Sequence, residues 1–430
     1  MNTPAGRPLI ELRKVCMDFA KPSGTTLPVL ADIDLALHSR EILGILGRSG
    51  AGKSTLLRIA AGLEQPTSGQ VYHGAATLTG PVEGIAVVFQ TFALFPWMTV
   101  IENVEAGLDV FALPRNERRQ RAEAAIDLIG LDGFQEAYPR ELSGGMRQRV
   151  GFARAIVTGS PILLMDEPFS ALDVLTAETL RSDFIDLWLE REIPTNSVML
   201  VTHNIEEAVL MCDRIVILSS NPGRVAAEIA VSLPHPRNRL DDAFRAIVED
   251  IYASLTSRAI ASLAAPAAHR GGLALVLPRA SVNQMSGFVE TLAGPPYHGR
   301  SRLGEIARIL GLQVDDLFPV AEALHLLEFA ELREGAVRLT TAGRLFGHGG
   351  TEERKRLFKE HLIEFVPLAA HIRRVLDERG EHRAPRVRFE SELEDHLTRR
   401  DVERTLRVVI GWARYAELFA YDDRARLFLI

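Results

Sequence analysis

A glycine-rich segment, Gly47–Ser54, has the residue types and the spacing needed to hold a row of phosphates. It fits the pattern G-x-x-x-x-G-K-[ST] at every fixed position and follows an apolar run. Glycine lets backbone N–H groups turn toward a polyanion, and the start of a helix adds partial positive charge. The predicted phosphate contacts are Gly47, Ser49, Gly50, Ala51, Gly52, Lys53, Ser54 and Thr55.

Two side chains of this loop and a pair of carboxylates predict what chemistry follows. Lys53 supplies a point charge for the outer phosphates, and the Ser54 hydroxyl is a ligand for Mg²⁺. Asp166 ends the apolar run Leu163–Met165 and is a second Mg²⁺ ligand, while Glu167 can polarise an attacking water as a general base. Such a pair alone is more often a solvated strand end. Behind a phosphate loop, the catalytic interpretation is favoured.

These residues need a sheet whose strands end at one edge. Up to about residue 250, apolar runs of strand length alternate with helical patterns, and uninterrupted apolar runs suit a sheet covered on both faces. The pattern predicts an α/β fold with a largely parallel sheet. The expected strands are Glu41–Leu46, Ile85–Phe89, Ile162–Met165, Ser197–Val201 and Ile215–Leu218, and the expected helices include Lys53–Gly62 and Thr176–Glu192.

The composition excludes several other classes of protein. The chain has 430 residues, 47% of them apolar, and 49 Lys+Arg against 56 Asp+Glu give a net charge of −7. This excludes a disordered chain and a uniformly basic nucleic-acid binder. Cys16 and Cys212 cannot build a disulfide framework, and we expect both to be core thiols in a reducing compartment. We also expect no secretory signal and no membrane span, because no apolar run approaches roughly 20 residues.

The length predicts more than one domain, and the composition changes near residue 256. From Thr256 to Gly299 the chain is rich in Ala, Gly and Pro, and after Arg300 it is mostly helical in pattern. We predict a nucleotide-binding domain at 1–255, a linker at 256–279 and a C-terminal domain at 280–430.

The segment Leu142–Arg149 indicates which class of phosphate-binding protein the chain resembles. It reads Leu-Ser-Gly-Gly-Met-Arg-Gln-Arg and resembles the signature sequence of ATP-binding cassette (ABC) ATPases. Ser143, Gly144 and Gly145 offer a hydroxyl and unhindered N–H groups at a helix start, which is again anion-binding chemistry. The resemblance implies a P-loop ABC cassette whose cofactors are ATP and Mg²⁺. It also implies a homodimer in which each signature covers the ATP of the other copy.

Other positions match the same family in order along the chain. The resemblance implies that Gln90 contacts Mg²⁺ and the attacking water, and that His203 contacts the γ-phosphate. It also implies that Asp173 belongs to the D-loop, which communicates across the dimer. Phe19 is a candidate for stacking on adenine, with a place in the core as the equal alternative.

The apolar and aromatic cluster Phe92–Val100 follows Gln90 and has two interpretations, internal packing or a socket for a membrane subunit. The family uses this region for the second purpose. The sequences of Leu94–Trp97, Ser170–Glu178 and Leu233–Arg239 are most similar to those of the nitrate/sulfonate/taurine group of bacterial importers. The resemblance thus implies permease subunits docked at Phe92–Trp97, an indirect periplasmic substrate-binding partner, and a place on the cytoplasmic face of the inner membrane.

The C-terminal part contains two stretches with one plan, three helices followed by a hairpin, which is the winged-helix order. The first has expected helices at Ser281–Leu292, Leu303–Leu310 and Asp315–Phe329 before a hairpin arm at Gly335–Thr340. The second has expected helices at Leu368–Asp377, Phe389–His396 and Asp401–Leu418 before a hairpin of Leu418–Tyr421 and Leu427–Ile430. Overall the segment resembles the AAA-associated C-terminal domain. We predict a mostly helical, winged-helix-like domain, single or tandem, with a regulatory or dimer-clamping role.

A rival interpretation is a soluble ABC ATPase that acts on nucleic acid through this C-terminal part. Residues 300–430 contain about 23 basic and about 23 acidic residues, whereas a DNA-binding module carries a basic face. The locally basic stretch Arg373–Arg388 is interrupted by Asp377, Glu378 and Glu381. We therefore expect no direct nucleic-acid partner.

Overall fold

The computed structural model describes residues 7–20, 26–47, 50–219, 222–263, 273, 275–310, 314–333, 336–395 and 397–430. The chain divides into two compact units, one of residues up to Phe19 and Pro28–Val248, the other chiefly Glu249–Ile430. Helix α7 (Asp242–Leu263) crosses this division. The linker was expected at 256–279, but its first eight residues, 256–263, form the end of α7. Residues 264–272 and 274 lie outside the described part.

The first unit is built on a six-stranded sheet in the order β10-β9-β3-β8-β7-β6. All neighbours run parallel except β10, which is antiparallel to β9. Every residue of β3, β7 and β8 is buried, as uninterrupted apolar runs predict. The strands are β3 (Ile42–Gly47), β6 (Ile85–Val88), β7 (Ile162–Asp166), β8 (Ser197–Thr202), β9 (Arg214–Leu218) and β10 (Val225–Ala230).

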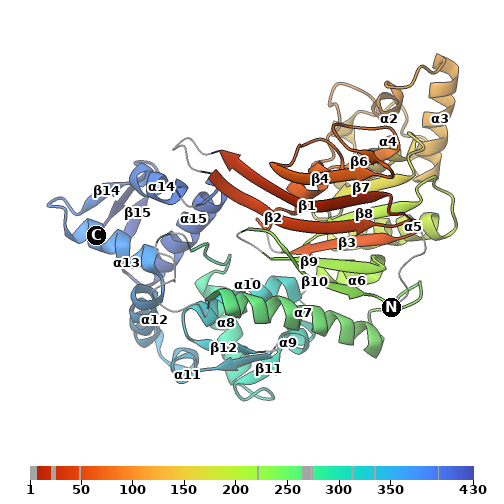
Figure 1. The fold of residues 1–430 in the computed structure, drawn as a ribbon. Coiled ribbons are helices and arrows are strands. Elements are labelled where there is room, and N and C mark those ends of the chain that lie inside the picture. Colours follow the sequence, from red (N-terminus) through yellow and green to blue (C-terminus); the bar gives the residue numbers. More distant parts are fainter. Residues whose placement is uncertain are drawn as a thin grey trace. The chain divides into compact units, whose positions relative to one another are not determined.

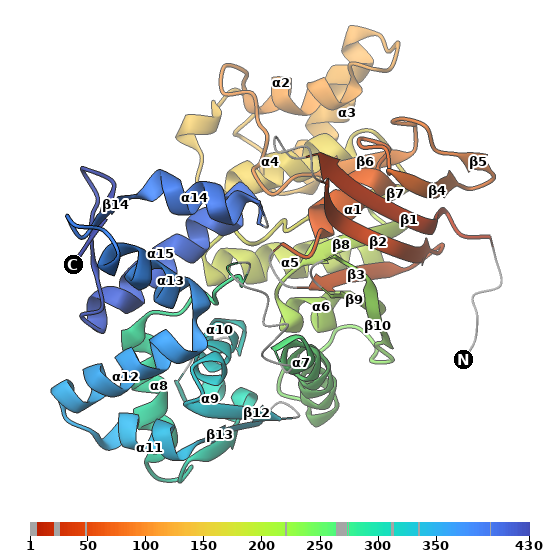
Figure 2. The same ribbon diagram turned by 60° about the vertical axis from the view of Figure 1, so that its left-hand side comes forward.

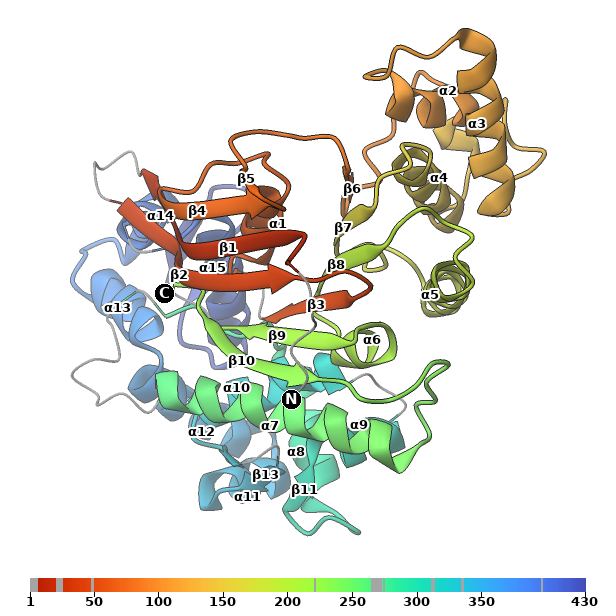
Figure 3. The ribbon, with the colours of Figure 1, turned by 45° about the vertical axis from the view of Figure 1, so that its right-hand side comes forward.

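A second, antiparallel sheet that the sequence analysis did not assign has the order β2-β1-β4-β5. Figure 3 shows helices α4, α5 and α6 on one face of the six-stranded sheet, with α1 and the antiparallel sheet on the other. One apolar core joins both sheets to α1. The bounds are β1 (Ile10–Ala20), β2 (Thr26–Leu37), β4 (Ser68–His73), β5 (Ala76–Thr77) and α1 (Lys53–Ala60).

Helices of the first unit begin at capping residues that the sequence supplies. Thr99 and Glu102 form a reciprocal capping box at α2, and Asp173 and Asn204 cap α5 and α6 with their side chains. In Figure 1, α2, α3 and α4 gather beside the β6 edge of the sheet. The helices are α2 (Val100–Glu105), α3 (Arg115–Leu128), α4 (Gly144–Ile156), α5 (Val174–Leu189) and α6 (Ile205–Met211), with short turns at Ala106–Leu108 and Pro139–Glu141.

The second unit contains the same element order twice, helix–strand–helix–helix–strand–strand. Figure 2 labels the three helices of each half, α8 to α10 and α13 to α15. Each half has a three-stranded sheet with the last strand in the middle, β11-β13-β12 and β14-β16-β15. The first half comprises α8 (Val282–Ala293), β11 (Arg300–Arg302), α9 (Leu303–Leu310), α10 (Val314–Leu326), β12 (Ala330–Arg333) and β13 (Ala336–Leu339). The second comprises α13 (Pro367–Asp377), β14 (Arg383–Pro385), α14 (Arg386–Glu394), α15 (Arg399–Tyr415), β15 (Ala420–Asp422) and β16 (Leu427–Leu429). The three helices and the hairpin of each half were expected, whereas the strand after the first helix, β11 or β14, was not. The winged-helix assignment stays a prediction.

The two halves share an aromatic core and so form one unit. Phe329 stacks on Phe346 with ring centroids 4.8 Å apart, and Phe358 lies edge-on to Trp412 at 6.2 Å. The Trp412 indole also donates a 2.8 Å hydrogen bond to the carbonyl of Ala280. Helices α11 (Thr341–His348) and α12 (Thr351–Phe365), which the sequence analysis did not assign, carry Phe346 and Phe358 into this core.

Two expectations from composition can be compared with the structure. Among the described residues, no helix is long and apolar enough to cross a membrane. Both cysteines are free thiols, and Cys212 is buried as expected, whereas Cys16 is partly exposed and is not a core thiol.

Candidate functional site

The phosphate loop joins the end of β3 to the start of α1. Gly50 and Gly52 both have φ of 86°, which L side chains rarely adopt, and a Cβ on Gly52 would lie 2.7 Å from a methyl of Leu30. Lys53 is buried, and its Nζ donates a 2.7 Å hydrogen bond to the carbonyl of Gly47 across the loop. Ala51 and Thr55 lie in the same loop and helix start, and Ser49 lies outside the described residues.

Oxygen ligands suited to Mg²⁺ converge beside this loop. The Ser54 hydroxyl donates a 2.9 Å hydrogen bond to the Asp166 carboxylate, which ends β7 and is only 6% exposed. Burial raises the pKa of Asp166, and the hydrogen bond from Ser54 opposes that shift. A buried carboxylate next to a hydroxyl is a hard oxygen donor set whose charge a cation would compensate, so these residues fit Mg²⁺.

The Glu167 carboxylate lies where three other predicted residues meet. The Gln90 amide donates to it at 2.9 Å, His203 Nδ1 lies 3.4 Å away, and Lys53 Nζ lies 3.8 Å away. Glu167 has a positive φ of 47°, and its N–H is held by the carbonyl of Val201 on β8. Such a backbone persists only where its surroundings fix it.

Topology explains why residues so far apart in sequence meet here. Lys53 follows β3, Gln90 follows β6, Glu167 follows β7 and His203 follows β8, and these four strands are parallel neighbours. Carboxyl ends of parallel strands lie at one edge of the sheet, where ligands of such folds bind. The structure brings these predicted residues together, and their catalytic roles remain to be proposed.

The predicted signature forms the first turn of α4. Ser143 is the N-cap, and its hydroxyl accepts from the N–H of Met146 at 3.3 Å. Gly144 and Gly145 follow, and a Cβ on Gly145 would overlap the methyl group of Thr176 on α5. Asp173 caps α5 by accepting from the N–H of Thr176, and hydrogen bonds from Thr176 lower the pKa of its carboxyl.

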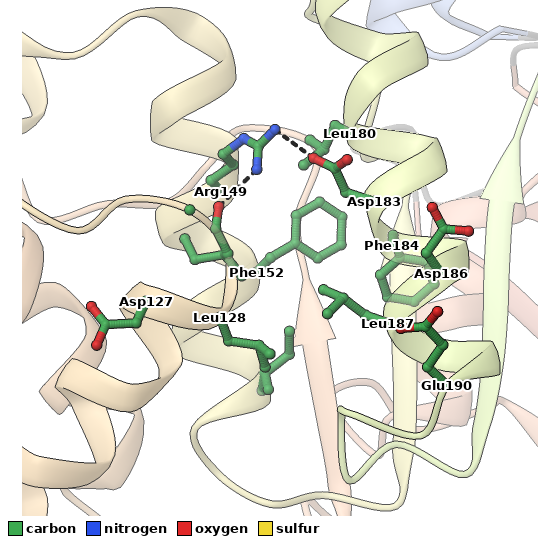
Figure 4. A pocket seen from close by; sticks show the side chains of 13 residues that line it. Asp127, Leu128, Arg149, Phe152, Leu180, Asp183, Phe184, Asp186, Leu187 and Glu190 are labelled. Carbon is green, nitrogen blue, oxygen red and sulfur yellow. Dashed lines mark hydrogen bonds and ion pairs between the residues drawn. The ribbon is translucent and has the colours of Figure 1, made fainter.

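Arg149 ties the signature helix to its neighbours, a contact that sequence reasoning missed. Its guanidinium donates to the carbonyl of Ile129 at 2.7 Å and to Asp183 on α5 at 2.7 Å. Figure 4 shows this pair at the mouth of a cavity of about 330 Å³ between α3, α4 and α5, with Phe152 and Phe184 facing its interior. The only sequence signal was an arginine within the signature segment, because its partners lie far along the chain.

The Phe92–Trp97 segment forms a loop with a fixed backbone and exposed aromatic rings. The amide of the buried Asn103 bonds the backbone of Phe95 at 2.8 and 3.1 Å, and Arg154 donates to the carbonyls of Phe92 and Ala93. Trp97 is 69% exposed and Phe95 39%, with ring centroids 5.6 Å apart. Of the two interpretations, internal packing does not apply to these two rings.

Phe19, near the end of β1, is 39% exposed and therefore not a core residue. Its assignment to adenine stacking stays a prediction.

In the C-terminal unit, three arginines of the basic stretch 373–388 form ion pairs with carboxylates. Arg373 pairs with Asp377, Arg386 with Glu390 and Arg388 with Glu392, each at (i, i+4) on its own helix. Paired side chains of this kind are typical of a solvated helix face.

Comparisons with known proteins agree with this geometry. A family model described as "ABC transporter" matches residues 30–170, and one described as "C-terminal AAA-associated domain" matches residues 304–422. The nitrate import ATP-binding protein NrtD of Synechocystis sp. is 44% identical over 214 residues, 49% of this chain and 79% of that protein. The aliphatic sulfonates import ATP-binding protein SsuB of Bacillus licheniformis is 42% identical over 233 residues, 54% of this chain and 89% of that protein. The taurine import ATP-binding protein TauB of Pseudomonas putida is 40% identical over 242 residues, 56% of this chain and 90% of that protein.

Proposed function

The chain belongs to the ATP-binding proteins of ABC transporters, and we propose that it is the ATP-hydrolysing subunit of a bacterial importer for nitrate, a sulfonate, taurine or a related small anion. The observation that carries the hydrolytic part is the meeting of Lys53, Gln90 and His203 within 4 Å of the Glu167 carboxylate. The names of the relatives support the choice of substrate class.

In this proposal the phosphate loop binds ATP, and each nearby side chain has one task. Lys53 and the loop amides hold the phosphates. Ser54, Asp166 and Gln90 would hold Mg²⁺, which when bound would supply positive charge next to the phosphates. Glu167 accepts the proton of the attacking water, with Gln90 fixing the orientation of its carboxylate. His203 contacts the γ-phosphate, and Phe19 stacks on adenine.

Each ATP is shared between two copies of the chain. Ser143, Gly144 and Gly145 present a hydroxyl and N–H groups at the start of α4, where the helix dipole favours an anion. They cover the nucleotide of the second copy, and Asp173 links the two sites. Closing and reopening of this homodimer then drives the membrane subunits.

The exposed pair Phe95 and Trp97 is the contact for a permease subunit, and its surroundings predict the chemistry of the partner. A cavity of about 430 Å³ beside Trp97 is lined by three acidic residues, Glu102, Glu105 and Asp109, and by Arg118. Arg118 pairs with Asp109 at 2.7 Å, which leaves an acidic rim. A partner segment with apolar and basic side chains fits it. This partner places the protein at the cytoplasmic face of the inner membrane, with a periplasmic substrate-binding protein as an indirect partner.

ATP hydrolysis by the purified full-length protein and its Lys53→Ala and Glu167→Gln variants tests the proposal. Removing the phosphate-binding cation or the general base should lower kcat at least about 100-fold. A matched control is Lys359→Ala, a lysine on α12 in the other unit, which should hydrolyse ATP at the rate of the unchanged protein. Hydrolysis by either site variant at the unchanged rate would remove these roles.

A further inference from the structure

The segment 233–239, between β10 and α7, contacts both ends of helix α6. Two arginines of this segment make the contacts, Arg237 at the C-terminal end of α6 and Arg239 at its N-terminal end. The first turn of α6 begins directly after the His203 loop. Whatever fixes α6 therefore also fixes the direction in which that loop leaves β8.

Arg237 is the anchor of this segment. Its side chain is 1% exposed. It donates hydrogen bonds of 2.7 and 2.6 Å to the carbonyls of Val209 and Cys212, which lie at the C-terminal end of α6. A third bond, to the carbonyl of Leu233 at 3.0 Å, closes the segment on itself. A cation at the last carbonyls of a helix satisfies acceptors that the helix leaves open. The backbone next to Arg239 is thereby held in place.

Arg239 joins two helices that both lead from nucleotide-facing loops. Its Nη1 donates to Glu178 on α5, and its Nε lies 3.6 Å from Glu206 in the first turn of α6. Asp173 is the N-cap of helix α5, and α6 begins two residues after His203. Without a cation between them, two carboxylates on adjacent helices would repel each other.

We propose that Arg239 is a positioning residue for ATP hydrolysis, which holds the starts of α5 and α6, and with them the Asp173 and His203 loops, in one arrangement. The inference rests on the proposed role of His203. The buried pair Arg181–Glu207, at 3.2 Å, joins the same two helices, so loss of Arg239 changes their alignment without separating them. Helix α7 begins at Asp242, three residues after Arg239, and continues into the second unit.

The test measures steady-state ATP hydrolysis by full-length Arg239→Ala and Arg239→Lys variants. Arg239→Ala should lower kcat about tenfold and change KM for ATP less than about twofold. The reason for this split is that the phosphates bind to the loop after β3, which Arg239 does not touch. Arg239→Lys keeps the positive charge without the two-pronged guanidinium. Its kcat should lie between that of Arg239→Ala and that of the unchanged protein. The matched control is Arg245→Ala, which removes an exposed arginine that pairs with Asp242 at 3.6 Å on its own helix and should leave kcat unchanged.

A double-mutant cycle with Glu206→Gln separates positioning from general loss of structure. If Arg239 acts through Glu206, the double variant should lose no more kcat than Arg239→Ala alone. A kcat for Arg239→Ala within twofold of the unchanged protein would overturn the inference, and so would fully additive losses in the cycle. Failure of the proposed function is seen separately, because it would appear as full hydrolysis by Glu167→Gln.

Discussion

Gln148 is a polar side chain whose buried surroundings leave it without hydrogen bonds in the described part of the chain. It lies on α4, five residues after the N-cap Ser143, and is fully buried. Neither its amide nitrogen nor its amide oxygen has a hydrogen-bond partner in the described part of the chain. An unpaired buried polar group costs about 1–3 kcal/mol. The signature helix of the nucleotide-free protein is therefore less stable than its packing allows.

Replacing Gln148 by methionine, which has a similar volume and no strong polar group, should raise the free energy of unfolding by about 1 kcal/mol. Urea denaturation of the nucleotide-free protein measures this. Gln120→Met, at an exposed position of α3, is the control and should change the free energy by less than about 0.5 kcal/mol. Destabilisation by Gln148→Met would mean that the amide is satisfied, contrary to this interpretation.

The positions of residues that belong to a sequence motif could be predicted from the sequence. Contacts with residues that lie far along the chain could not. Lys53, Ser54, Asp166 and Glu167 were predictable because each follows or ends an apolar run, and parallel strands bring their ends together. Asn103 was not, since its partners are backbone groups of a loop. No local pattern in the sequence marks such a contact.

Helices α5 and α6 are joined by an ion pair that burial works against. Arg181 and Glu207 are both buried and lie 3.2 Å apart. Burial raises the pKa of Glu207 above its usual 4.5 and lowers the pKa of Arg181, so on both sides it outweighs the attraction of the pair. The pair therefore contributes alignment of the helices rather than net stability.

The raised pKa of Glu207 makes the free energy of unfolding depend on pH. A carboxyl whose pKa is raised by folding binds its proton more tightly in the folded state. Its contribution to stability then falls as pH rises from about 4.5 through the raised pKa. Glu207→Gln should remove that fall, which urea denaturation between pH 4 and 8 would detect. Glu190→Gln, at the exposed end of α5, should leave the dependence as it is.

Arg181→Met tests the other side of the same pair. It would leave the Glu207 carboxylate buried without its cation and should cost about 3–5 kcal/mol of unfolding free energy. Adding Glu207→Gln to this variant should restore most of that loss. No recovery in the double variant would show that the two side chains stabilise the fold independently.

The bounds of helices and strands were easier to predict where the residues of the element are uniformly buried. The parallel strands, of which β3, β7 and β8 are buried along their whole length, appear within about two residues of the expected bounds. Helix α12 was missed because it buries only Phe358 and Leu362 among many charged residues, which leaves little apolar signal. The start of the predicted linker was wrong because alanine-rich sequence also suits a helix, here the end of α7.

At the scale of the whole molecule, the acidic excess bears on how two copies associate. The C-terminal 131 residues are close to neutral, with about 23 charges of each sign, so the excess of the −7 chain lies in the part that binds a polyanion. Attraction for ATP must therefore be local, from Lys53, the loop amides and, in the proposed dimer, the signature of the second copy. Two acidic copies repel each other at low ionic strength, so the proposed dimer must likewise depend on local contacts at the shared nucleotide.

Mixing two inactive variants tests whether the sites are shared. Lys53→Ala removes the phosphate-binding cation, and Ser143→Glu places a negative charge where the other copy's phosphates would lie. In a mixed dimer one site combines both defects, while the other pairs an intact Lys53 with an intact Ser143. Random association of equal amounts makes half of the dimers mixed, so the mixture should recover about a quarter of the unchanged ATPase rate. A mixture of Lys53→Ala with Glu167→Gln should recover none, because both defects lie on the same side of the shared site. Recovery in neither mixture would mean that each chain hydrolyses ATP within its own boundaries and that the Ser143 turn has another use.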